Sequence, residues 1–336
     1  MSQMKAVRVV STNAEVREEP VPTPGRRQVL IKVHAASLNY RDMLLLKGAY
    51  PIQTKKDVVP LSDGAGEVVA VGEDVSRVKK GDRVSIGCTN WVGGSFLPEY
   101  RETSVGFSVD GTLAEYAVFE EDSLVHIPDY LSYVEAASLP CAAVTAWAAL
   151  NKINPLQAGQ TVLVQGTGGV ALFALQFAKL FGARVLAITS SDEKAAKLKE
   201  LGAEAVINYS TTPDWEKEIL ALTDGQGVDR VIEIAGEKTI KKSAAATKVT
   251  GVIVVIGFAS GVGGGLTPME ILMRSITVTG SMIGPRVDFE AMLKGMEVAK
   301  LRPVVDSVYP FAEYNEAFKR LESGQQVGKV VIEIAK

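Results

Sequence analysis

The stretch Val162-Leu163-Val164-Gln165-Gly166-Thr167-Gly168-Gly169-Val170-Ala171 determines the fold expected for this chain. Its apolar, β-branched start is typical of a buried strand, and the residues that follow, 172–179, have the pattern of a helix. A strand that turns through glycine into a helix directs backbone N–H groups and a positive helix end at one place, which suits a pyrophosphate. The spacing matches G-x-G-x-x-G/A, with Ala171 in the last place. We therefore predict that a dinucleotide contacts Gly166, Gly168, Gly169 and Val170.

A regular alternation of strand and helix patterns surrounds this stretch. Helical patterns such as Asp192–Leu201 and Trp215–Leu222 separate short runs that are apolar throughout. Strands without a polar face are typical of a parallel sheet covered by helices on both sides. We therefore predict an α/β fold with a doubly wound parallel sheet of the Rossmann type over residues 128–285. Its expected strands are Thr161–Gln165, Arg184–Thr189, Ala205–Asn208, Arg230–Ile234, Val252–Ile256 and Ile276–Thr279.

The residues on either side of this region have a different pattern. Up to residue 127, short strand patterns alternate with turns rich in proline, glycine and lysine, which indicates a small, mostly antiparallel β domain or barrel. After residue 285 the strand–helix alternation stops, and a helix pattern at Phe289–Lys300 and a last strand at Lys329–Ile334 follow. We predict that 286–336 returns to 1–127 and forms one discontinuous domain with it.

Composition limits the classes of function. The 336 residues carry a net charge of −3 and a pI near 5.7, without a block of basic residues. These values argue against nucleic-acid binding, and the apolar stretches are too short to cross a bilayer. Two cysteines are too few for a disulfide framework. We expect a cytoplasmic enzyme with no nucleic-acid or membrane partner.

The end of the second strand of the parallel sheet indicates which dinucleotide binds. An NAD site normally carries Asp or Glu about 20 residues after the glycines, where it holds the ribose 2′-OH. Here the chain has Thr189, Ser190 and Ser191, followed by Lys194. Hydroxyls and an ammonium suit a 2′-phosphate, so we predict that NADP(H) is the cofactor. Alternatively, the two serines only cap the helix that follows.

Other strand ends of the sheet are expected to line the same cleft, because ligands bind at the carboxyl ends of parallel strands. Small residues at successive strand ends fit a flat nicotinamide ring. The residues at these ends that we predict to contact the cofactor are Gly257, Phe258 and Met282.

Further segments resemble the medium-chain dehydrogenase/reductase superfamily over essentially the whole chain. They are Leu38–Asp42, Asp63–Gly72, Gly81–Val84, Gly111–Tyr116, Leu139–Ala146, Leu201–Ala203 and Gly328–Val331. The resemblance implies a GroES-like β-barrel catalytic domain, a Rossmann domain and hydride transfer from a nicotinamide. It also implies a homodimer through the edge strand Ile276–Thr279, whose apolar residues suit pairing with a partner strand.

The positions of the zinc ligands separate the branches of this superfamily. Zinc-dependent members carry Cys where this chain has Asn39 and a His-Glu pair where it has Ser62-Asp63, and only Cys141 still matches a ligand. Catalytic zinc needs about three protein ligands, which a lone thiolate does not supply. We predict that no metal is bound, and we interpret Cys141 as a small buried apolar residue.

The chain is therefore more similar to zinc-independent quinone oxidoreductases and enoyl reductases. In these, an Asn-Tyr-x-Asp segment and a following Gly-x-Tyr-Pro line the nicotinamide pocket, which implies that Asn39, Tyr40 and Tyr50 do so here. A phenol can protonate the product of hydride transfer, so we predict that Tyr50 and Asn39 are catalytic and that Tyr40 binds substrate. Alternatively, the two tyrosines are packing aromatics. Asp42 fits a turn-fixing role or a pairing with Arg41 better than the role of a base.

A loop over residues 89–102 is longer than in compact quinone reductases. Its Trp91 is expected to form a wall of the substrate pocket or, alternatively, to anchor the loop to its own domain. The resemblance also implies that Thr145 lies near the nicotinamide, Tyr209 near the 2′-phosphate and Lys329 near the pyrophosphate.

These features predict a zinc-independent, NADPH-dependent oxidoreductase that transfers hydride to a small electrophilic carbonyl compound such as a quinone, enone or enal. Two alternatives stay open at this point. One is an alcohol dehydrogenase or ketone reductase of the same superfamily, and the other is an NADPH-binding protein without turnover.

Overall fold

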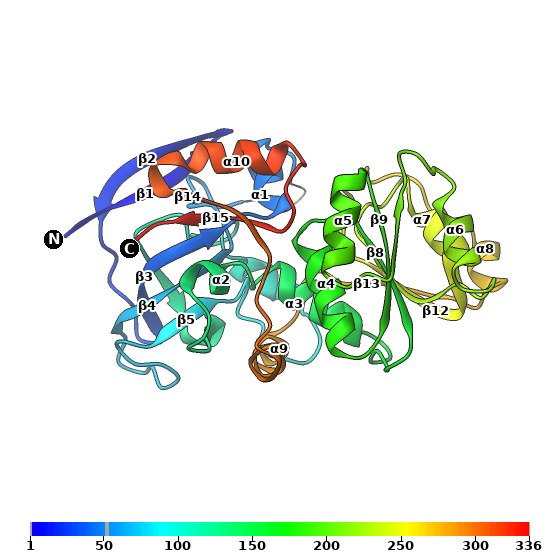
Figure 1. The fold of residues 1–336 in the computed structure, drawn as a ribbon. Helices are drawn as coiled ribbons and strands as arrows, with labels where there is room; N and C mark the ends of the chain where they lie inside the picture. The colour runs from blue at the N-terminus through cyan, green and yellow to red at the C-terminus, as the bar shows by residue number, and fades with distance from the viewer. Residues whose placement is uncertain (1, 51–53, 336) are drawn as a thin grey trace. The chain divides into compact units, whose positions relative to one another are not determined.

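The computed structural model describes residues 2–50 and 54–335, which fall into two compact units (Figure 1). The first unit consists of Met1–Val144 and Pro285–Lys336, and the second of Thr145–Gly284. Pro51, which belongs to the Gly-x-Tyr-Pro segment, lies outside the described residues. The chain therefore leaves the first unit once and returns to it.

The second unit contains the predicted parallel sheet. Its six strands run in the order β10-β9-β8-β11-β12-β13, and every neighbouring pair is parallel. From β8 the chain builds outward to β10, and then crosses to the other side of β8 to build β11, β12 and β13, which confirms the doubly wound topology. The strands are β8 (Thr161–Gln165), β9 (Arg184–Thr189), β10 (Ala205–Asn208), β11 (Val228–Glu233), β12 (Thr247–Val255) and β13 (Thr277–Gly280).

Helices cover both faces of this sheet, as Figure 1 shows for α4 and α5 on one side and α6 and α7 on the other. Side chains of α6 and α7, including Trp215 and Ile219, share one core with Leu163, Ile188 and Val231 of the strands. Burial on both faces explains why the strands lack polar alternation. The helices are α3 (Ala142–Asn151), α4 (Gly169–Leu180), α5 (Asp192–Glu200), α6 (Trp215–Ala221), α7 (Ile240–Ala246) and α8 (Pro268–Leu272).

The first unit is a mostly antiparallel β domain. Its larger sheet follows the order β14-β15-β3-β4-β5-β7, with β6 also paired to β3, while β1 and β2 form a separate hairpin. The strands are β1 (Gln3–Val10), β2 (Asn13–Pro20), β3 (Gln28–Ser37), β4 (Asp63–Val71), β5 (Arg83–Ile86), β6 (Tyr116–Glu120), β7 (Leu124–His126), β14 (Val305–Pro310) and β15 (Lys329–Glu333). The helices are α1 (Tyr40–Leu46), α2 (Tyr133–Ala137), α9 (Arg286–Ala299) and α10 (Tyr314–Glu322), with short 3₁₀ turns at Pro98–Thr103, Glu121–Ser123 and Phe311–Glu313.

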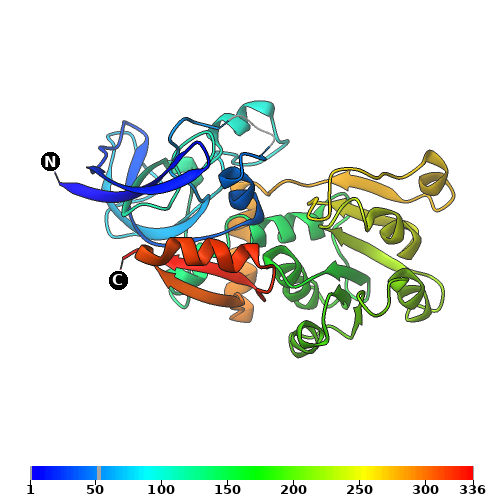
Figure 2. The same cartoon turned by 90° about the horizontal axis from the view of Figure 1, so that it is seen from above.

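The C-terminal segment is an integral part of the first unit. β15 pairs antiparallel with β3, with Val331 opposite Ser37, and α10 packs on β14 and β15 (Figure 2). Val330 and Ile332 are buried in the same core as Ala36 and Leu38. The tail that breaks the strand–helix rhythm therefore completes the β domain.

The boundary between the units falls at 144/145 instead of the expected 127/128. The reason is α2, whose Ala136 and Ala137 pack with Ala35, Ala65 and Val331 of the β domain. The second boundary, at 284/285, differs from the expected one by a single residue. Among the helices of the described ranges, none is both long and apolar enough to cross a bilayer.

Candidate cofactor and active sites

The glycine turn after β8 has the geometry of a phosphate-binding loop. Gly166 has a φ of +77°, which favours glycine, and its N–H donates to the carbonyl of Ile188 at 2.7 Å. Gly168 is the N-cap of α4 and has no side chain to satisfy the first amides of that helix. A Cβ at Gly166 or Gly168 would meet no atom within 4 Å, so the backbone is open to a ligand there. The structure thus brings Gly166, Gly168, Gly169 and Val170 together at one helix start.

Polar side chains gather at the neighbouring ends of β9 and β10. Thr189 lies opposite Asn208 in the parallel pair, and the N–H of Tyr209 donates to the carbonyl of Thr189 at 2.9 Å. Ser191 is the N-cap of α5, where its hydroxyl accepts from the N–H of Lys194 at 3.3 Å. The capping role is therefore present. The residues predicted to hold a 2′-phosphate, Ser190, Ser191, Lys194 and Tyr209, lie on these two adjacent strand ends.

The predicted nicotinamide contacts also follow strand ends. Gly257 and Phe258 come after β12, and Met282 comes after β13. The Thr145 hydroxyl donates to the carbonyl of Met282 at 3.3 Å, so the structure joins two of the predicted residues. Phe258 and Met282 are exposed, whereas Thr145 is buried.

A buried carboxylate fixes the turn that follows β11, and sequence reasoning missed it. Glu233, the last residue of β11, is fully buried and accepts five hydrogen bonds. Its donors are the side chains of Gln165, Thr239 and Ser243 and the N–H groups of Ala235 and Gly236. The available signal was a polar residue at the end of each of two apolar strands, since Gln165 ends β8 as Glu233 ends β11.

In the first unit, the junction between β3 and α1 holds two predicted residues. Asn39 is the N-cap of α1, and its N–H donates to Asp42 Oδ2 at 2.7 Å. Asp42 is fully buried, and burial raises its pKa to about 7, with Arg41 acting in the opposite direction. Asp42 therefore fixes the start of the helix, as the sequence indicated. Tyr40, at the first helical position, is 44 % exposed.

Lys329 has a different environment from the one expected. Its side chain is buried, and its Nζ donates to Leu38 O at 2.8 Å, Asn39 Oδ1 at 2.6 Å and Asp63 Oδ2 at 3.3 Å. The ammonium is thus held by acceptors of its own unit, and its contact with a pyrophosphate stays a prediction.

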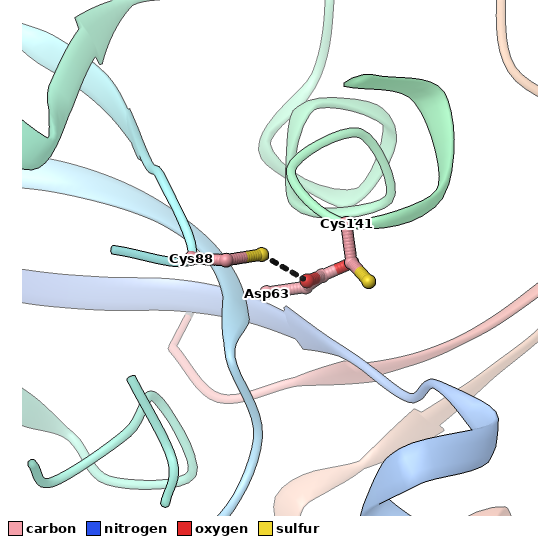
Figure 3. A group of neighbouring side chains, drawn as sticks. All are labelled: Asp63, Cys88 and Cys141. Carbon is pink, nitrogen blue, oxygen red and sulfur yellow. Dashed lines mark hydrogen bonds between the residues drawn. The ribbon is translucent and has the colours of Figure 1, made fainter. Parts of the chain in front are cut away.

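Asp63 also contacts a pair of cysteines (Figure 3). Cys88 Sγ donates to Asp63 Oδ1 at 3.7 Å, and one ligand atom each of Asp63, Cys88 and Cys141 lies within 4.8 Å of the others. The hydrogen bond between the thiols, together with burial, raises the pKa of Cys88, whereas the same hydrogen bond lowers the pKa of Cys141. Sequence reasoning missed this cluster, because Cys88 comes from the chain after β5 and Cys141 directly precedes α3.

Tyr50 lies in an aromatic and cationic environment. Its ring packs on the ring of Phe107, with 4.4 Å between the two centroids. The Arg41 guanidinium lies 4.5 Å from the centroid of the Phe107 ring. Burial raises the pKa of the Tyr50 phenol, although Arg41 opposes that shift. The phenol is therefore protonated at neutral pH. Arg41 had no predicted role beyond a pairing with Asp42.

The long loop after β5 is anchored through Trp91. The indole is buried, its Nε1–H donates to the carbonyl of Gly93 at 3.1 Å, and its ring meets Phe96 edge-on at 5.2 Å. The carbonyl of Trp91 accepts from the N–H of Arg286 at 2.8 Å. These contacts favour the anchoring alternative over a wall of the substrate pocket.

The donor set of the cysteine cluster does not fit a catalytic zinc ion. Two sulfurs and one carboxylate could supply three ligands, but the carboxylate is already paired with the ammonium of Lys329. A dication bound to Asp63 would lie within roughly 7 Å of that ammonium, and at an effective dielectric constant of about 20 the two repel by about 5 kcal/mol.

Comparisons with known proteins agree with these two units. The alcohol dehydrogenase GroES-like domain family matches residues 25–129, and the zinc-binding dehydrogenase family matches residues 169–297. A zinc-type alcohol dehydrogenase-like protein of Schizosaccharomyces pombe is 44 % identical over 318 residues, which cover 93 % of this chain and 91 % of that protein.

Two solved structures extend the comparison. An NAD-dependent alcohol dehydrogenase is 34 % identical, with a TM-score of 0.90 over 99 % of this chain and 100 % of that one. The 2-octenoyl-CoA carboxylase reductase CinF, in complex with NADP and 2-octenoyl-CoA, is 25 % identical, with a TM-score of 0.89 over 99 % of this chain and 88 % of that one. The GroES-like domain, the parallel-sheet domain and the relatives over nearly the full length establish that this chain belongs to the medium-chain dehydrogenase/reductase superfamily and is an alcohol dehydrogenase-like oxidoreductase.

Proposed function

We propose that the protein is a zinc-independent, NADPH-dependent oxidoreductase that transfers hydride to a small electrophilic carbonyl compound, namely a quinone, enone or enal. The observation that carries this proposal is the buried ammonium of Lys329, which is paired with the carboxylate of Asp63 that a metal would need as a ligand. A reductase without a metal must stabilise the developing oxyanion with hydrogen-bond donors and supply a proton from a side chain.

Tyr50 and Asn39 supply these functions in the proposed mechanism. The Tyr50 phenol is protonated at neutral pH and can therefore donate a proton to the reduced product, and the Arg41 guanidinium, which opposes the rise in the phenol pKa caused by burial, favours that transfer. Asn39 accepts from Lys329 through Oδ1, and its Nδ2, without a partner among the described residues, is a donor for the substrate oxygen. When bound, the nicotinamide supplies the hydride, so that hydride and phenol proton together complete a two-electron reduction.

The strand ends of the second unit support NADPH over NADH. Hydroxyls at Ser190, Ser191 and Tyr209 and the ammonium of Lys194 lie where the ribose 2′-substituent of a dinucleotide would bind. No carboxylate ends β9, since its last residue is Thr189. The complex of CinF with NADP supports this choice, whereas the NAD-dependent alcohol dehydrogenase argues for NADH.

Steady-state kinetics test the proposal. The protein is assayed with NADPH and NADH against a panel of quinones, enones and enals, and its metal content is measured in the same preparation. We expect NADPH oxidation with at least one of these classes at well under one metal ion per chain. Stoichiometric zinc or strict use of NADH would refute the proposal.

The alternative with specific support is an alcohol dehydrogenase or ketone reductase, because relatives of 30–44 % identity carry alcohol dehydrogenase names. Oxidation of simple alcohols by the metal-free protein, without reduction of the panel, would favour it. NADPH binding without turnover of any acceptor would instead favour a binding protein.

We also propose a homodimer formed through β13, the edge strand of the parallel sheet. Val278 on this strand is 38 % exposed, and Leu272 and Met273 near it are 69 % and 72 % exposed. An unpaired edge with apolar side chains favours pairing with a second copy. A mass near twice 35.8 kDa in light scattering is expected, and a monomer at micromolar concentration would contradict this. The two free cysteines support the cytoplasmic location that we propose.

A further inference from the structure

Lys329 is the only lysine among the described residues whose side chain is buried, and the sheet register explains its place. β15 begins at Lys329 and pairs with β3, which in turn pairs with β4 so that Ser37 lies opposite Asp63. These pairings bring the end of β3, the start of β4 and the start of β15 to one place. All three acceptors of the ammonium, Leu38 O, Asn39 Oδ1 and Asp63 Oδ2, come from this junction.

One carboxylate therefore stands between a cation and two thiols. Asp63 Oδ2 faces the ammonium, while Oδ1 accepts from the Ser62 hydroxyl at 2.9 Å and from Cys88 Sγ at 3.7 Å. Cys141 lies next to Asp63 on the thiol side (Figure 3). Asp63, Cys88 and Cys141 form a three-donor set whose negative charge is already balanced from the other side.

We propose that the ammonium of Lys329 is the resident cation of this site: it excludes divalent metal ions from the Asp63–Cys88–Cys141 set and fixes the orientation of Asn39. The inference deepens the proposed function and rests on it in one respect, that the working enzyme contains no metal.

Charge explains the exclusion of metal. A divalent ion on the donor set would face a fixed positive charge across a single buried carboxylate, with little solvent to screen it. Without that charge, one carboxylate and two sulfurs are ligands that zinc and cobalt(II) accept. Replacement of Lys329 alone would then be enough to create a metal site at the Asp63–Cys88–Cys141 set.

Hydrogen-bond chemistry explains the orientation of Asn39. An ammonium has donors and no acceptor, so Asn39 must present Oδ1 to it, and Nδ2 then points away. This leaves Nδ2 as a donor without a partner among the described residues. Lys329 is thus a positioning residue for the donor that Asn39 offers to a substrate oxygen.

Cobalt(II) titration of the full-length protein tests the exclusion, because thiolate–cobalt charge transfer reports binding at sulfur. The variants are Lys329→Gln, which keeps N–H donors for Leu38 and Asp63, and Lys329→Met, which does not. We expect no charge-transfer band for the wild-type protein, and binding at least roughly 100-fold tighter for both variants, because the repulsion is removed. Lys55→Gln removes an exposed lysine of the same unit and is the matched control; it should behave as the wild type.

The controls separate the possible failures. Adding Cys88→Ser to Lys329→Gln should abolish the band, since it removes one ligand. Stoichiometric metal in the wild-type protein would overturn the proposed function as well as this inference. A folded Lys329→Gln that binds no cobalt would overturn the inference alone and leave the proposed function intact.

Thermal unfolding covers the case in which the variants fold poorly. If zinc replaces the lost ammonium, it should raise the unfolding midpoint of Lys329→Met and leave that of the wild type unchanged. No rise in either variant would overturn the exclusion of metal by Lys329.

Kinetics test the orientation of Asn39 separately. In Lys329→Gln the side-chain amide of Asn39 can adopt the flipped orientation, because glutamine offers both a donor and an acceptor. We expect kcat, measured at saturating NADPH so that a contact of Lys329 with the pyrophosphate does not affect it, to fall by roughly 10-fold, the equivalent of one hydrogen bond to a developing charge. A purely structural role would instead lower the unfolding midpoint with kcat per folded molecule unchanged, and this result would overturn the positioning role.

Discussion

The cofactor turn of the second unit and the polar cluster of the first unit are built in opposite ways. The turn is one continuous stretch, 162–171, whose ligand groups are backbone amides exposed by glycine. The cluster is assembled from Asn39, Asp63, Cys88, Cys141 and Lys329, and its groups are side chains, of which the buried ammonium of Lys329 and the buried carboxylate of Asp63 neutralise each other. Under the proposed function, a local motif defines where the dinucleotide binds, whereas long-range packing defines the chemistry available to the substrate.

The largest effect is expected from placing a charge in the open turn. Gly168→Asp adds a side chain where a Cβ meets no atom within 4 Å, so the fold should be retained. Its carboxylate would repel the pyrophosphate by about 4 kcal/mol, which raises KM for NADPH by roughly 100- to 1000-fold. Initial rates over a range of NADPH concentrations measure this change. Gly168→Ala is the control and should have a much smaller effect; equal KM values for the two variants would place the phosphates elsewhere.

The next effect concerns Tyr50, the proton donor of the proposed mechanism in the first unit. Tyr50→Phe keeps the ring contact with Phe107 and removes the phenol, so kcat should fall by roughly 100-fold, the usual contribution of a general acid. KM for NADPH should not change. The matched control is Tyr309→Phe, which alters a partly buried phenol of the same unit outside the predicted site. An unchanged kcat in Tyr50→Phe would make Tyr50 a packing residue.

The buried carboxyl of Asp42 predicts a pH dependence of stability. Because its folded-state pKa is raised to about 7, the native state binds the proton more tightly than the unfolded state does. Asp42 therefore makes the free energy of unfolding fall as pH rises from about 4 through the folded-state pKa to about 8, with little further change above that range. Asp42→Asn removes this contribution. Its stability relative to wild type should grow by about 3 kcal/mol between pH 4 and pH 7, as measured by urea unfolding, and a constant difference would contradict the shift.

The smallest effect is expected at the end of β9. Ser190→Asp places a carboxylate beside the predicted 2′-phosphate site, while NADH lacks that phosphate. The ratio of kcat/KM for NADPH over NADH should fall by roughly 10-fold or more, the equivalent of one hydrogen bond to a charged group. Ser190→Ala should lower the ratio less. If neither variant alters the ratio, the 2′-phosphate does not contact this strand end.

The features that could be predicted from sequence are those encoded by a local pattern, and the features that could not are those assembled from distant segments. The strands Thr161–Gln165 and Arg184–Thr189 lie where the apolar runs placed them, because each is buried between two helix layers and carries its pattern locally. The edge strand Ala205–Asn208 also lies at its predicted position, although it is only partly buried. The return of the C-terminal strand was also predicted, from the broken rhythm alone. In contrast, β2 was missed, because its sequence, Asn13–Pro20, is largely charged and belongs to an exposed hairpin.

The cluster shows why the rest could not be predicted. Cys88 and Lys329 acquire their roles through the pairing of distant strands, which no local pattern encodes. Lys329 resembled a phosphate-binding lysine by its motif, yet its ammonium is held by Asn39 and Asp63. The residues at the zinc-ligand positions, Asn39 and Ser62-Asp63, predicted from sequence that the site holds no zinc. Only the fold revealed that Lys329 places a positive charge next to Asp63.

The most direct test of the central claim measures metal content and NADPH-dependent enone or quinone reduction in one preparation, before and after treatment with a strong chelator. We predict well under one metal ion per chain and an unchanged rate after chelation. Loss of activity with the chelator and recovery on adding zinc would contradict the claim that the site works with the ammonium of Lys329 as its cation.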